Sequence, residues 1–153
     1  MRTVQHKQLH LGQTHIATIE FDARSRDDIP QILRGLQHIY VTKALKNPVF
    51  DILEGLLPKE TDPTNGRPGM DLWNAFVLAT LRVNLNWDYD RLMEMANQHQ
   101  SIRQMLGHGT FDTQSYKLQT IKDNVALIDE EALTSINKIV VDAGHQLLKK
   151  TKH

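Results

Sequence analysis

The chain has 153 residues and a mass of 17.6 kDa, enough for one compact domain or two small subdomains but too little for a full-sized two-domain enzyme. Its 18 Lys and Arg residues balance 18 Asp and Glu residues, so attraction to nucleic acid must come from local clustering. The absence of cysteine excludes disulfides, thiolate-bound zinc and thiol catalysis.

The first 26 residues predict an extended arm, because they show only loose alternation of apolar and polar side chains. They lack the continuous apolar core of a secretion signal. No later segment carries the run of roughly 20 apolar residues that crosses a bilayer. We therefore expect a cytoplasmic protein that does not enter a membrane.

Residues 27–58 predict a helical hairpin. Apolar residues recur at helical spacing over 28–45, and Asn47 followed by Pro48 gives the start signal of a second, short helix that ends at Pro58. Residues 59–69 hold prolines, glycines and alternating charges, which predict a linker. We expect an all-α protein, a bundle of short helices, with a second helical region over 70–150.

The segment 71–85 is apolar on nearly every side, which is typical of a helix surrounded by other helices. Asp88 is the expected cap of a helix over 88–98, and Ser101 the expected cap of a short turn over 101–106. A helix over 115–128 should follow, and a last helix should run from Asp129 to about Lys150.

Catalytic and metal-binding motifs find little support. The glycine pair around His108 reads as a helix stop and turn, not as a phosphate loop. His6 and His10 lie in a polar arm and do not form a zinc motif. Asp142 follows a β-branched run, as a strand-end nuclease aspartate would, but a helical period continues through that run. We predict no catalytic residue and no metal ligand in this chain.

The arrangement over 88–128 predicts a helix-turn-helix-like segment, because short helices follow one another across tight turns. On the third helix, the face opposite the apolar stripe carries side chains that suit base edges and phosphates. Asp123 lies on the same face and would repel phosphate, and a merely solvated polar face explains the pattern equally well. The candidate DNA-binding residues are Arg103, Ser115, Tyr116, Lys117, Gln119, Thr120, Lys122, Lys149 and Lys150.

The segment GRPGMDLWNAFVLATLRVNLNWDYDRLMEMANQHQSIRQMLGHG, followed by YKLQTIKDNVALIDEEALTSINKIVVDAGHQLLKK, resembles the N-terminal, InsH-like helical region of bacterial insertion-sequence DDE-type transposases. The likeness covers about residues 15–150 and lies in the order and spacing of the helices. It implies a DNA-binding, non-catalytic segment that recognises terminal inverted repeats in DNA transposition and associates with the nucleoid. Mg²⁺ would belong to a separate catalytic domain, so no cofactor is expected here.

A second hypothesis is a helical dimerisation or protein-interaction module without its own DNA contact. The last helix carries Val141 and Leu148 on a flank away from its main apolar stripe, which predicts a weak homodimer. Double-stranded DNA and a second copy of the chain are therefore the two expected partners.

Overall fold

A computed structural model describes residues 15–21, 28–56, 70–109 and 111–142, with only the helical backbone at 140–142. Every regular element in these ranges is helical, which confirms the all-α prediction. They are the 3-10 helix η1 (Ile16–Thr18) and the α-helices α1 (Asp28–Val41), α2 (Lys43–Gly55), α3 (Leu72–Leu85), α4 (Tyr89–Gln98), α5 (Gln100–Met105), α6 (Leu118–Val125) and α7 (Glu130–Asp142). Of the predicted arm, only 15–21 is described, and it contains η1.

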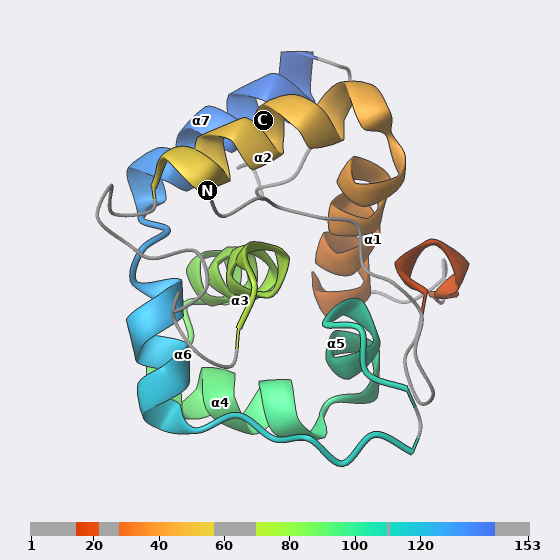
Figure 1. The fold of residues 1–153 in the computed structure, drawn as a ribbon, viewed down its shortest axis with the longest axis vertical. Coiled ribbons are helices and arrows are strands. Elements are labelled where there is room, and N and C mark those ends of the chain that lie inside the picture. Colours follow the sequence, from red (N-terminus) through yellow and green to blue (C-terminus); the bar gives the residue numbers. More distant parts are fainter. Residues whose placement is uncertain (1–14, 22–27, 57–69, 110, 143–153) are drawn as a thin grey trace.

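Helix α3 forms the centre of the molecule, and the other helices surround it in Figure 1. The Asp71 carboxylate accepts a hydrogen bond from the backbone N–H of Asn74 and caps the helix. Trp73 is 2% exposed, while Phe76 and Leu81 are fully buried. The prediction that 71–85 is a buried central helix is confirmed.

The start of α2 differs from the prediction. The chain breaks at Thr42, which is extended (φ −102°, ψ 103°), and Pro48 lies inside α2. Pro48 lacks the N–H of the usual helical hydrogen bond, and a proline inside a helix costs about 3 kcal/mol or more. Burial of Val49 and Leu53 beyond the proline offsets it. Figure 1 shows α2 crossing the end of α1 instead of running back beside it as in a hairpin.

One hydrophobic core contains buried residues from both sides of the predicted linker. The linker itself, over 59–69, lies outside the described residues. The Trp73 ring of α3 lies 4.8 Å from the ring of Tyr40 in α1 and 6.0 Å from that of Phe50 in α2, measured between centroids. Offset and edge-on aromatic pairs at such distances add to the burial energy. The helices before and after residues 59–69 therefore pack on one shared core.

One of the two caps predicted in the second half of the chain is confirmed, and the other differs. Asp88 caps α4 as predicted, since its carboxylate accepts from the N–H of Arg91 at 2.7 Å. Helix α5 starts before Ser101, however, and its cap is His99, whose Nδ1 accepts from the N–H of Ile102 at 3.3 Å. A single extended residue, His99, thus separates α4 from α5. Because α5 already begins at Gln100, Ser101 lies inside the helix and cannot be its cap.

The last helix begins as predicted. The Asp129 carboxylate accepts from the N–H of Ala132 at 2.8 Å, and Glu130 and Glu131 occupy the first turn. Asp142 lies in α7, so its helical prediction is confirmed and the strand-end alternative is wrong. The flank formed by Val141 and Leu148 lies outside the described side chains.

Candidate nucleic-acid interface

The exposed face of α6 carries Gln119, Lys122 and Asp123, which follow one another at helical spacing. The opposite side buries Ile121 and Val125, at 0% and 2% exposure. Helix α6 packs on α3 and α4, so its apolar side fixes which residues face outward. The exposed side chains therefore sit on a firmly seated helix.

The candidate residues before and beside this face take different positions. Ser115 and Lys117 are exposed in the extended segment that leads into α6, and Lys117 is the residue at the helix cap. Thr120 is half-buried on the flank of the helix. Lys149 and Lys150 lie outside the described residues. The α6 face, a term used below for Ser115, Lys117, Gln119 and Lys122, thus contains the four predicted residues that are exposed, two in α6 and two in the segment before it.

The placement of Tyr116 on an exposed helical face is wrong, because α6 begins at Leu118 and Tyr116 is only 5% exposed. Its backbone N–H donates to Oδ1 of Asn97 at 2.6 Å, and its carbonyl accepts from Nδ2 of the same side chain at 3.0 Å. These paired bonds to α4 hold the backbone of Tyr116 in place of the helical bonds that the apolar spacing predicted.

The Tyr116 side chain ends in a buried polar network. Its hydroxyl lies 2.6 Å from Nε2 of His108 and accepts from Nδ2 of Asn74 at 3.3 Å. Nδ1 of His108 lies 2.7 Å from Oδ2 of Asp112. An ionised carboxylate can only accept, so Nδ1 of a neutral His108 carries the proton and Nε2 accepts from the Tyr116 hydroxyl. The network therefore joins α3 to the segment between α5 and α6.

Ionisation within this network is set by burial and hydrogen bonds. Burial, reinforced by the negative charge of Asp71, raises the pKa of the Tyr116 phenol well above its ordinary range. Tyr116 is therefore a neutral donor and not a phenolate nucleophile. The N–H of Gln114, at 2.8 Å, and then the bond to His108 lower the pKa of Asp112, so its carboxylate is ionised at neutral pH.

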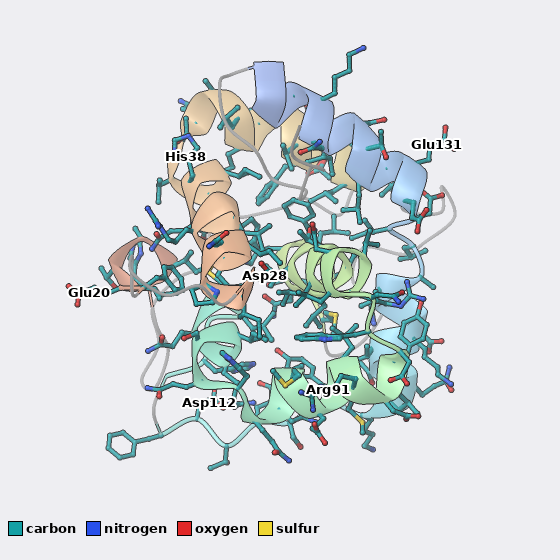
Figure 2. The ribbon with its side chains drawn as sticks, turned by 180° about the vertical axis from the view of Figure 1, so that it is seen from behind. Glu20, Asp28, His38, Arg91, Asp112 and Glu131 are labelled. Carbon is teal, nitrogen blue, oxygen red and sulfur yellow. The ribbon has the colours of Figure 1, made fainter. Side chains whose placement is uncertain are left out.

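Arg103 lies on α5 and is half-buried. One of its terminal nitrogens donates to the carbonyl of Ala96 at 3.4 Å and the other to the carbonyl of Asp112 at 3.0 Å. Figure 2 shows Asp112 close to α5. Arg103 thus ties the end of α4 to the segment that leads to α6.

The turn around His108 is confirmed as a helix stop. Gly107 has a φ of 91°, a conformation that favours glycine, and its N–H donates to the carbonyl of Gln104. The N–H of His108 donates to the carbonyl of Arg103 at 2.9 Å, which completes a Schellman motif at the end of α5. This turn places the His108 ring against that of Tyr116, with centroids 5.5 Å apart.

Sequence reasoning missed Asn74, Asn97 and Asp112, and it interpreted His108 mainly as part of a turn. The signal was present for Asn74, because an amide in an otherwise apolar central helix must find polar partners. Its Nδ2 does so at Tyr116, while its Oδ1 is buried without a hydrogen-bond partner among the described residues. No local pattern marked Asn97, whose partner lies 19 residues away.

No protein-family model, curated protein or solved structure matches the chain. Within the described ranges, no group of three or more His, Asp or Glu side chains is arranged to hold a metal ion. The helices described here are all too short or too polar to cross a membrane.

Proposed function

We propose that this chain is the DNA-binding, non-catalytic segment of a transposase and that it contacts duplex DNA through the α6 face. The observation that carries the proposal is the exposure of Gln119 and Lys122 on a helix whose other side is buried, with Lys117 exposed at the residue that precedes this helix. A rigid helix with outward lysines and a carboxamide can contact phosphates and a base edge at once.

Each side chain has a distinct task in this proposal. Lys117 and Lys122 neutralise phosphates and give affinity for any sequence. Gln119 can form paired hydrogen bonds with adenine, but in the free protein its Nε2 donates to Oδ1 of Asp123 at 2.8 Å. Binding must exchange that bond for one to the base, and the exposed carboxylate of Asp123 opposes the approach of phosphate.

The resemblance to the N-terminal region of insertion-sequence transposases supports the same proposal and supplies its context. Recognition of terminal inverted repeats would be the role of this segment, and strand cleavage with Mg²⁺ would belong to a separate catalytic domain. The competing hypothesis, a helical interaction module without DNA contact, predicts no dependence of any DNA affinity on the α6 lysines.

The deciding experiment compares two double variants that lose the same charge. Lys117→Ala with Lys122→Ala removes the proposed phosphate contacts. Lys43→Ala with Lys138→Ala removes two exposed lysines from α2 and α7, which lie at the opposite end of the molecule in Figure 1 from α4. Fluorescence anisotropy with labelled duplexes measures the affinity of each variant at low salt.

The first variant should bind all duplexes about tenfold or more weakly than the wild type, because both phosphate contacts are lost. The control should bind as the wild type does. Equal weakening in both variants would reveal only a general charge effect, and unchanged binding in both would remove the α6 face as the DNA contact. A wild type that binds no duplex would favour the interaction module.

A further inference from the structure

A pocket of about 330 Å³ opens at the corner where α4 meets α5. It is lined by residues that, Gly109 apart, end in polar groups: Gln98, Gln100, Arg103, Gln104, His108 and Gly109. Three carboxamides in one small pocket offer paired donors and acceptors, the pattern that matches the edge of a nucleobase. No carboxylate is among the described residues that line it.

The charge in the pocket wall favours an anion. Both hydrogen bonds that Arg103 donates go to main-chain carbonyls, so its guanidinium has further N–H groups for a ligand. The carboxylate of the nearby Asp112 is turned to His108 and to the N–H of Gln114. A guanidinium with carboxamides beside it is suited to a phosphate oxygen.

An exposed aromatic residue, Phe111, follows the pocket residue Gly109 closely in the sequence. Phe111 is 90% exposed, which makes it the more exposed of the two large apolar side chains that are open to solvent in the described ranges. It follows Gly109 of the pocket lining by two residues, so their Cα atoms lie within about 7 Å of each other. An exposed aromatic face at such a site suits stacking on an unpaired base.

We propose that the pocket and Phe111 together bind a nucleoside phosphate, with the base between Phe111 and the glutamines and the phosphate at Arg103. This deepens the proposed DNA-binding function and rests on it: the natural source is an unpaired nucleotide in the bound DNA. A free nucleotide presents the same chemistry, and the experiment separates the two sources.

Fluorescence anisotropy of the full chain would compare a labelled duplex that carries one unpaired adenosine with the same duplex without it. Phe111→Ala removes the stacking face, and Phe111→Tyr retains it. Gln104→Glu puts a carboxylate into the pocket at nearly constant shape, with Asn47→Asp on exposed α2 as the matched control. Deoxyadenosine monophosphate alone serves as the probe for a free nucleotide.

The wild type should prefer the duplex with the unpaired adenosine by roughly fivefold or more. Phe111→Ala and Gln104→Glu should lose that preference, while Phe111→Tyr and Asn47→Asp keep it. Equal wild-type binding of both duplexes, without binding of the mononucleotide, would overturn the proposal and leave the α6 face intact. If neither duplex binds, the proposed function fails; mononucleotide binding that depends on Phe111 would then assign the pocket to free nucleotides.

Discussion

Helix α3 and the segment around Tyr116 are held in place by two different kinds of buried contact. In α3 the apolar residues from Leu72 to Leu81 surround the helix, and each is buried whichever neighbour covers it. In the second segment Tyr116 is buried because specific polar partners, Asn74 and Asn97, meet it from 42 and 19 residues away. The burial of an apolar helix can be predicted from its local sequence, because apolar contact has no preferred direction. A network of directional hydrogen bonds depends on partners that only the complete fold brings together.

The largest expected effect tests the apolar half of this comparison. Phe76→Ala should lower the free energy of unfolding by about 3 to 5 kcal/mol, because it loses transfer energy and leaves a cavity in the centre of the core. Val41→Ala, at a residue that is 52% exposed, is the control and should change stability by no more than about 0.5 kcal/mol. Urea denaturation followed by circular dichroism measures both; similar losses would contradict the assigned packing.

The polar half is tested by Tyr116→Phe, which keeps the ring and removes the hydroxyl. His108 and Asn74 then lose a buried partner, so the free energy of unfolding should fall by about 1 to 3 kcal/mol. Ser115→Ala, at the exposed neighbouring position, should have almost no effect. A Phe variant as stable as the wild type would show that the network does not hold the segment.

These two regions also show how far the sequence could predict the molecule. The cap at Asp88, the helix starts at Asp71 and Asp129 and the glycine turn at Gly107 rest on local signals, and the structure confirms them. The break at Thr42 was missed because Pro48 is a strong local signal for the start of a helix. In the structure, tertiary packing overrides that signal, and α2 begins before the proline. On α6, local periodicity identified the outward side of the helix but not the residue at which the helix begins.

Acid should weaken the network through Asp112. Its folded-state pKa lies below the unfolded value, so its stabilisation is fully present above the unfolded pKa and is lost as the pH falls through the folded pKa. The contribution should be on the order of 1 kcal/mol. Asp112→Asn should flatten this part of the stability profile, which denaturation at a series of acidic pH values would measure. An unchanged profile would assign the acid dependence to other carboxylates.

The smallest effect concerns the α6 face itself. Asp123→Asn removes a negative charge beside Lys122 and should raise DNA affinity by a few-fold, by about 0.2 to 1 kcal/mol. It should leave stability nearly unchanged, because the bond from Gln119 is exposed. Anisotropy at low and at moderate salt checks the gain, which should shrink as salt screens the charge. Weaker binding would mean that Asp123 orients Gln119 for the base.

The central claim, that α6 delivers its lysines to DNA phosphates, is tested most directly by the salt dependence of DNA affinity. The logarithm of the binding constant should fall linearly with the logarithm of salt concentration, with a slope of about −0.9 for each phosphate neutralised. Lys117→Ala with Lys122→Ala should make that slope shallower by about 1.8, the share of two contacts. A double variant whose slope equals that of the wild type would contradict the assignment of DNA binding to α6.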